Sequence, residues 1–270
     1  MPNILTSIHG RRLGLGALGE LISNGRFLSG PAPADLWKLA PSPNDADPST
    51  FHVLFDDFLN PASATVSDLM AWTSNDDAAT GTNAFQDAAG GIYNVVTAAA
   101  DNDYHAMSSV AENWLFAADK ELWFEARFRL AEANTPESTW WVGLTDTLTT
   151  GGMQANAAGP LASYDGALIW KTPETALTVN FETSNAATQN TLSAFATAVT
   201  NTWHRAGFYF DGVGTITPYF HNGTEWTVGT AQDISLTGLE EMHAVFGVKA
   251  GPTAGAETLQ MDYIKVVQRR

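Results

Sequence analysis

Short runs in which apolar and polar residues alternate recur along the chain from residue 51 onward. The clearest run is ELWFEARFRL at 121–130, in which every second residue is apolar. Because the side chains of a β-strand point alternately to its two faces, this period of two predicts a strand with one face against a core and the other in water. LTVNFET at 177–183 repeats the pattern.

Nine further runs predict strands, with turn residues between them. They span 51–58, 92–97, 104–110, 139–145, 166–171, 203–210, 215–220, 242–249 and 258–267. Asn222-Gly223 is a strong hairpin signal after the 215–220 run, and Pro218 inside that run indicates an edge strand or a bulge. About eleven strands at this spacing predict an all-β fold, a two-sheet antiparallel sandwich.

The segments between the predicted strands include two long loops and two helix candidates. Residues 73–90 and 149–163 are rich in Gly, Ala, Asn and Thr, and we predict that they are loops, which often carry binding residues. A short helix is predicted at 33–40 or at 61–71.

Residues 1–48 differ from the rest of the chain, because they contain no strand pattern and five prolines fall between Pro31 and Pro48. We therefore divide the chain into an N-terminal anchoring arm with a proline-rich linker, 1–48, and a β-sandwich body, 49–270. The arm is expected to be needed for attachment to a partner and dispensable for folding of the body.

Composition and charge indicate a folded, acidic protein and argue against nucleic acid and anionic membranes as partners. Hydrophobic residues make up 44% of the chain and charged residues 16%, as in a folded protein. The net charge is −16, and residues 39–119 contain twelve acidic residues and no Lys or Arg. Such a body repels nucleic acid and anionic membranes, so we expect neither as a partner, although acidity also simply keeps a protein soluble.

Two further observations concern export and cofactors. The N-terminus has no continuous apolar segment of the signal-peptide kind, so we expect no signal peptide. Cysteine is absent, which excludes disulfides and thiolate metal sites. Gly14, Gly16 and Gly19 satisfy G-x-G-x-x-G, but the strand and long helix of a dinucleotide site are missing, so no nucleotide cofactor is expected.

Calcium is the cofactor that we considered further. Asp101, Asp103 and His105 recur at every second residue, and Asp76 and Asp77 lie in a loop rich in carbonyl groups. Because no loop has dedicated ligand spacing, and Asp and Asn also form turns for backbone reasons alone, we expect no metal site, with structural calcium as the alternative.

Three segments near the C-terminus resemble a known family of domains. WHRAGFYFDGVGTITPYFHNGTEW at 203–226, MHAVFGVKAG at 242–251 and ETLQMDYIKVVQ at 257–268 are similar to the C-terminal half of concanavalin A-like lectin/glucanase domains, including laminin G-like modules. The run at 121–130 matches an earlier core strand of the family. The resemblance implies a jelly-roll sandwich for the body.

Enzymes of that family carry catalytic carboxylates on one strand as Glu-x-Asp-x-Glu, and this chain departs from the pattern. Glu121 and Glu125 share a strand face, but Trp123 and Phe124 lie between them. Four residues span about 13 Å, beyond the roughly 5–9.5 Å that glycoside hydrolysis requires. We therefore expect no catalytic residues and no enzymatic activity.

Lectins of the family stack aromatic rings on sugar faces, which makes aromatic residues in or beside loops candidates for glycan binding. The candidates are Trp72, Trp114, Trp140, Trp141, Tyr164 and Trp226. Core packing is the alternative role for each ring. Adjacent Trp140 and Trp141 must point to opposite faces of a regular strand, so at least one is expected to face a loop, a partner or solvent.

The opening ILTSIHGRRLGL at 4–15 resembles the start of virion structural proteins of tailed bacteriophages. The resemblance implies a non-enzymatic capsid decoration, cement or head-fibre protein, which resides in the virion, is made in the host cytoplasm and is anchored on the major capsid or connector protein. The arm residues expected to contact that partner are Ile4, Leu5, Ile8, Arg11, Arg12, Leu13 and Leu15.

Two functional hypotheses thus remain. The first is the virion structural protein, for which we expect a homotrimer. The alternative is a carbohydrate-binding module that recognises a host or environmental glycan. The two are not exclusive, since a virion protein can also bind a glycan.

Overall fold

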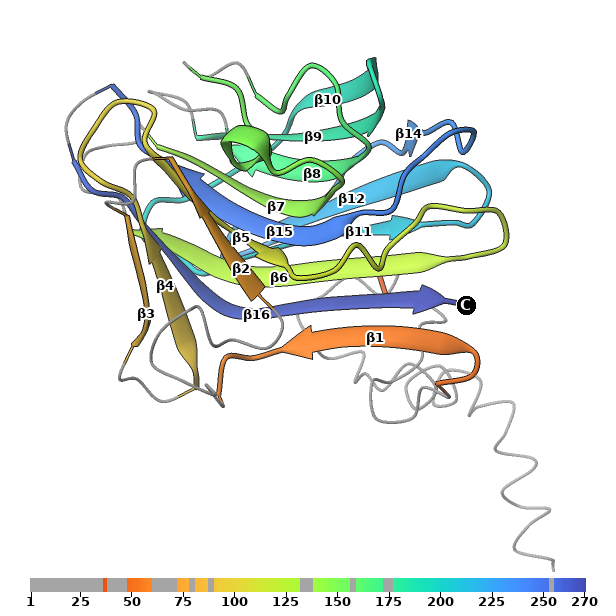
Figure 1. The fold of residues 1–270 in the computed structure, drawn as a ribbon, viewed down its shortest axis with the longest axis horizontal. Coiled ribbons are helices and arrows are strands. Elements are labelled where there is room, and N and C mark those ends of the chain that lie inside the picture. Colours follow the sequence, from red (N-terminus) through yellow and green to blue (C-terminus); the bar gives the residue numbers. More distant parts are fainter. Residues whose placement is uncertain are drawn as a thin grey trace, which may run out of the picture.

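The computed structural model describes residues 36–37, 48–59, 72–77, 81–86, 90–131, 138–155, 159–171, 177–252 and 255–270. These residues form two antiparallel sheets packed face to face, which confirms the predicted all-β sandwich (Figure 1). No helix in the described part of the chain is long and apolar enough to span a membrane.

The nine-stranded sheet is built around the long C-terminal strand. Its main path runs β13-β12-β11-β6-β16-β4-β3, with β1 beside β16 and β14 beside β12. Along one edge of β16, β4 pairs with the first half and β1 with the second half (Figure 1). The strands are β1 Phe51–Asp56, β3 Thr82–Gln86, β4 Ile92–Val96, β6 Leu122–Ala131, β11 His204–Phe210, β12 Thr215–His221, β13 Trp226–Val228, β14 Gln232–Asp233 and β16 Thr258–Arg269.

The seven-stranded sheet has the order β10-β9-β8-β7-β15-β5-β2. A short 3-10 turn, η2 Thr149–Gly152, follows β7 and lies over the outer face of this sheet. The strands are β2 Trp72–Asp76, β5 Tyr104–Ser109, β7 Thr139–Thr145, β8 Gly166–Lys171, β9 Thr178–Asn185, β10 Thr188–Thr197 and β15 His243–Lys249.

The main core lies between the two sheets and is rich in aromatic rings. The even-numbered residues of β6, from Leu122 to Leu130, point into it as the alternation predicts. Phe124 stacks on Phe208 of β11 with ring centroids 4.8 Å apart. Burial of such rings is a large part of the hydrophobic stabilisation of a sandwich.

The opposite face of β6 differs from the prediction that it meets water. Trp123 is fully buried and Glu125 is 2% exposed, because Leu36 and Trp37 pack over the outer face of the nine-stranded sheet. Leu36 and Trp37 belong to the range predicted as arm and linker, so part of that range contacts the body. The division at residue 48 stays a prediction, and residues 1–35 lie outside the described residues.

Five observed strands were missed by the alternation. Residues 73–90 were predicted to be a loop, yet β2 and β3 fall within or beside this range, so that prediction is wrong there. The other three are β10, β13 and β14. All five sit at or near sheet edges, where pairing with a neighbour holds them. The helix candidate at 61–71 lies outside the described residues, and Leu36 and Trp37 form a turn.

Pro218 of β12 lies opposite the break between β14 and β13, the two short strands that pair with β12 on the side away from β11. On the inner side Pro218 is opposite Phe208 of β11. On the other side β14 pairs with residues 215–216 and β13 with residues 219–221. Pro218, which has no N–H to donate, therefore lies opposite the gap between β13 and β14. This is close to the edge-strand position that the proline predicted.

Candidate functional site

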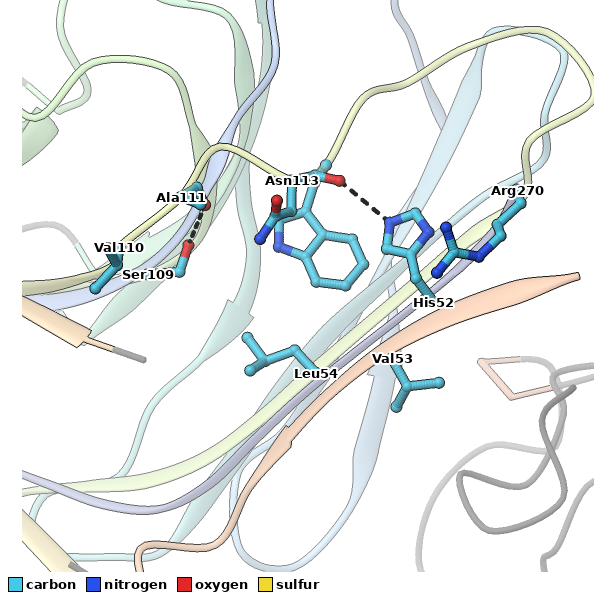
Figure 2. Close-up of a pocket in the computed structure, with 9 residues that line it drawn as sticks. His52, Val53, Leu54, Ser109, Val110, Ala111, Asn113 and Arg270 are labelled. Atoms are coloured by element: carbon cyan, nitrogen blue, oxygen red, sulfur yellow. Dashed lines mark hydrogen bonds between the residues drawn. The ribbon is translucent and has the colours of Figure 1, made fainter. Parts of the chain in front are cut away.

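A pocket of about 600 Å³ opens between β1 and the segment 109–114 (Figure 2). The His52 ring of β1 stacks on Trp114, with centroids 4.6 Å apart, and its Nε2 lies 3.1 Å from the carbonyl oxygen of Asn113. Leu54 and Arg270 line the same pocket from β1 and from the end of the chain. A cavity of this size with mixed walls suits a small ligand.

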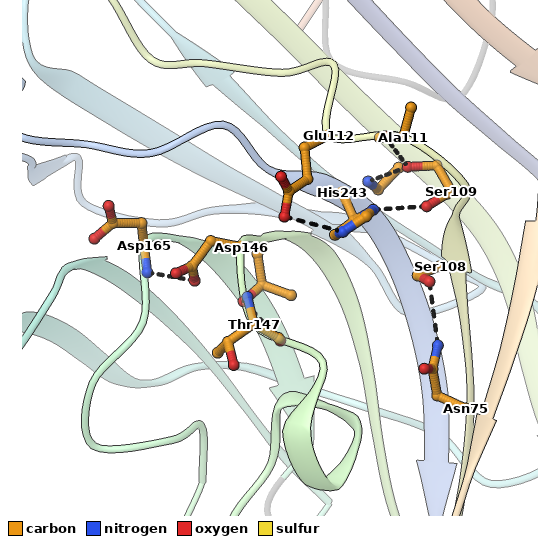
Figure 3. Close-up of polar contacts among 11 residues, drawn as sticks. Asn75, Ser108, Ser109, Ala111, Glu112, Asp146, Thr147, Asp165 and His243 are labelled. Carbon is orange, nitrogen blue, oxygen red and sulfur yellow. Dashed lines mark hydrogen bonds and ion pairs between the residues drawn. The ribbon is translucent and has the colours of Figure 1, made fainter.

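A second region of interest is a group of polar side chains on the outer face of the seven-stranded sheet (Figure 3). Most of these residues lie where β5 and β7 end and β15 begins, since His243 of β15 pairs with Thr145 of β7, whereas Asn75 lies on the neighbouring edge strand β2. We call them the outer polar cluster, and its members are Asn75, Ser108, Glu112, Asp146, Thr147 and His243.

Backbone and side-chain hydrogen bonds hold Asp146 in place. The N–H of Asp165 donates to Asp146 Oδ1 over 2.7 Å. Asp165 is itself buried and accepts from the N–H groups of Ala186 and Glu240, so it joins two loops at this edge. Burial raises the pKa of Asp146, and the backbone N–H bonds that it accepts oppose this rise. The Asp146 carboxylate is half-buried and positioned before any ligand arrives.

His243 and Asn75 are also held in defined orientations. One ring nitrogen of His243 lies 2.6 Å from the carbonyl oxygen of Ser109, and the other lies 3.2 Å from Glu112 Oε1. Asn75 donates to the Ser108 hydroxyl over 3.1 Å. Glu112 keeps 48% of its side chain exposed. The cluster thus presents carboxylate, amide and imidazole groups along the outer face of the sheet (Figure 3).

Next to the cluster, the outer face of the sheet is apolar and covered. Trp141 and Trp170 lie there beneath residues 148–155 and 159–164. Gly151, at a φ of 67°, lies against the Trp141 ring, where a side chain would clash. Lys249 donates to the carbonyl oxygens of Met153 and Gln154 over 3.0 and 2.9 Å, and burial lowers its pKa to about 8. The covering segment is thus fastened to the sheet.

Most of the aromatic residues predicted to bind glycans are core side chains. Trp140 faces the main core and Trp141 the opposite side of the sheet, as adjacent strand residues must, and both are fully buried. A ring that stacks on a sugar has to be exposed, and the structure leaves only Trp226 partly exposed, on the nine-stranded sheet. The other three rings are 2–3% exposed: Trp72, Trp114 and Tyr164.

The residues considered as calcium ligands have other partners. His105 lies 2.8 Å from the Ser74 hydroxyl and 3.0 Å from Asn83 Nδ2. Burial and a hydrogen bond with Asp77 raise the pKa of Asp103 to about 6. Within the described residues, no three His, Asp or Glu side chains gather as metal ligands would. The predicted contact residues of the arm, from Ile4 to Leu15, lie outside the described residues.

Sequence reasoning missed both the pocket and the outer polar cluster. His52, Trp114 and Arg270 are far apart in the chain, and no spacing rule connects them. Asp146 directly follows a predicted strand, and a polar residue at a strand end was the only local signal for the cluster.

Solved structures that resemble this one include several lectins. No protein-family model and no curated protein sequence matches the chain. A protein of unknown function from Shewanella oneidensis MR-1 has a TM-score of 0.56 at 11% identity, over 82% of this chain and 87% of that one. Peanut lectin, solved with a nine-residue peptide, has a TM-score of 0.56 at 12% identity, over 81% and 97% of the two chains.

Basic winged bean lectin, solved with Tn-antigen, has a TM-score of 0.55 at 9% identity, over 81% of this chain and 98% of that one. At such identities the likeness concerns the fold alone. The fold predicted from residues 203–268 is confirmed: the body is a legume-lectin-like, concanavalin A-like jelly roll.

Proposed function

We propose that this protein binds glycans without modifying them, and that the outer polar cluster is the binding surface. The observation that carries the proposal is the set of fixed polar groups at one end of the seven-stranded sheet, on a lectin-like fold. Fold likeness alone would not be sufficient, because one fold hosts many functions.

The chemistry of the cluster suits sugar hydroxyls. Each hydroxyl donates one hydrogen bond and accepts others, so it pairs with carboxylates and with amides. Asp146 and Glu112 supply acceptors, while Asn75 supplies both a donor and an acceptor. Because Asp165 and Ser108 already orient two of these groups, less side-chain freedom is lost when a ligand binds.

The virion hypothesis rests on the sequence alone. The capsid or connector partner, the homotrimer, the residence in the virion and the anchoring role of residues 1–48 stay predictions, because fold likeness to lectins does not bear on them. Glycan binding by the body is compatible with an arm that attaches it to a particle.

We expect the labelled protein to bind at least one glycan on a broad glycan array. Asp146→Asn should weaken the affinity for that glycan about tenfold, since a charge-assisted hydrogen bond contributes about 1.5–3 kcal/mol. Isothermal titration calorimetry with the retained glycan measures the change. Asn75→Ala removes a donor and an acceptor from the same surface and is expected to act in the same direction.

Asp233→Asn is the matched control, because Asp233 is an exposed carboxylate of the other sheet. It should bind as the parent does, and both Asp variants should melt within a few degrees of the parent. The proposal would be contradicted if the parent protein bound no glycan on the array, or if Asp146→Asn and the parent bound the glycan with equal affinity.

We also expect no hydrolysis of polysaccharides. Glu125 is engaged by Arg205, Tyr263 and Trp37, and Glu121 by Tyr209, so neither is available as an acid or a nucleophile. Incubation with β-glucans, galactans and bacterial surface polysaccharides should release no reducing ends above background. Turnover that disappears when one Asp or Glu is changed to its amide would refute this prediction.

A further inference from the structure

The pocket beside β1 is distinct from the outer polar cluster. Segment 109–114 forms its wall, and in the same segment Glu112 points to His243 on the other side (Figures 2 and 3). Leu54, Val110 and Ala111 supply apolar surface, and Val110 is 59% exposed at the rim. The proposed glycan site makes no use of this pocket.

Trp114 forms part of the pocket wall. Trp114 is 3% exposed, and its indole Nε1 has no hydrogen-bond partner among the described residues. The same holds for four other tryptophans among the described residues, and this nitrogen is closed to solvent, so Trp114 contributes its ring rather than its N–H to the pocket. The Trp114 backbone exchanges hydrogen bonds with Met242, which fixes the position of the ring.

The charged side chains that act on His52 in the pocket are positive. Burial lowers the pKa of His52, the hydrogen bond with the carbonyl oxygen of Asn113 opposes this, and the charges of Arg270 and Lys120 lower the pKa further. The Arg270 backbone N–H donates to Thr50, and its side-chain Nε lies 3.4 Å from the carbonyl oxygen of Phe51. The two terminal nitrogens of that guanidinium have no hydrogen-bond partner among the described residues.

We propose that this pocket binds a small ligand that carries one carboxylate on an apolar body. The carboxylate accepts from the terminal nitrogens of Arg270, and the apolar body packs on Leu54 and Val110. A single guanidinium matches one negative charge. A phosphate dianion would bring more charge and more acceptor oxygens than these groups satisfy.

Titration of the full-length protein at constant ionic strength tests the proposal. The probes are cyclohexanecarboxylate and benzoate as simple organic acids, glucuronate as a sugar acid, and cyclohexanecarboxamide, glucose and phenyl phosphate as comparators. We expect binding of at least one carboxylate, and at least tenfold weaker binding of its uncharged counterpart and of phenyl phosphate. Comparison of glucuronate with the simple acids identifies the source of the carboxylate.

Arg270→Gln should weaken binding of the carboxylate about tenfold, and Arg269→Gln is the matched control, because Arg269 is the exposed neighbour that pairs with Glu121 at 3.5 Å. Val110→Glu, which places a negative charge at the rim, should abolish binding, whereas Val228→Glu at a similarly exposed site on β13 should not. All four substitutions lie at exposed positions, so the variants are expected to fold.

Glycan binding through the outer polar cluster should be unchanged by Arg270→Gln, which separates failure of this proposal from failure of the proposed function. The proposal is overturned if no carboxylate binds at millimolar concentration, if the neutral or phosphate comparators bind equally well, or if Arg270→Gln and Arg269→Gln have the same affinity as the parent.

Discussion

Replacement of Trp37 by alanine is expected to lower the free energy of unfolding by about 3 kcal/mol, the range typical of a buried Trp truncated to Ala. Trp37 is 4% exposed and packs with Leu36 against Trp123, Tyr219 and Val267. Its indole N–H donates to buried Glu125, and Lys265 Nζ lies 3.6 Å above its ring. The substitution opens a cavity and removes a donor from a buried carboxylate. Urea denaturation followed by circular dichroism measures the loss.

Phe55→Ala is the matched control, because Phe55 is an aromatic residue of the same sheet that is 52% exposed, and its loss should cost much less. Two truncations extend the test. Deletion of residues 1–35 should leave stability unchanged if the arm prediction is right, whereas deletion of residues 1–48 also removes Leu36 and Trp37 and should lower stability as Trp37→Ala does. Equal stability of Trp37→Ala and Phe55→Ala would show that the contact is dispensable.

Arg205→Met is expected to lower the free energy of unfolding by about 3 kcal/mol, because removal of one partner leaves a buried charge without its counter-ion. Arg205 Nε donates to Glu125 Oε1 over 2.6 Å, and the Tyr263 hydroxyl donates to the same oxygen over 2.5 Å. The Glu125 side chain is only 3% exposed, so water does not replace the guanidinium. Chemical denaturation at pH 7 measures the effect.

Arg127→Met provides the comparison, because the Arg127 ion pair with Asp262 is more exposed, at 35% and 19%, and should contribute well under 1 kcal/mol. The double variant Arg205→Met with Glu125→Gln should be more stable than Arg205→Met alone, since an amide needs no counter-ion. A double variant less stable than Arg205→Met would mean that packing of Arg205, rather than its charge, accounts for the loss.

Strands with a strong local pattern were predictable, and strands without one were not. β7 and β8 were predicted with the observed bounds, because both are continuous runs of apolar residues between turn residues. β2 and β3, with the sequences WTSND and TNAFQ, have no such signal. They are strands because β5 and β4 offer hydrogen-bonding partners, and that pairing is a property of the assembled sheets.

The candidate site residues likewise could be predicted only in part from the sequence. Aromatic residues beside loops were reasonable candidates for sugar stacking, but whether a ring is exposed depends on what packs over it. Leu148, Gly151 and Met153 cover Trp141, and Leu36 with Trp37 covers Trp123 from a distant part of the chain. The position of an aromatic residue in the sequence does not show whether another segment of the chain packs over its ring.

The sequence by itself determined the all-β class, the jelly-roll resemblance, most strands and the absence of cysteine chemistry, because these follow from local alternation, turn residues and composition. Only the tertiary structure decided which faces are buried, that Glu125 pairs with Arg205, and that His52, Trp114 and Arg270 line one pocket. The physical reason is that burial and side-chain contact in a sandwich arise between strands far apart in the chain, as β1 against β16 illustrates.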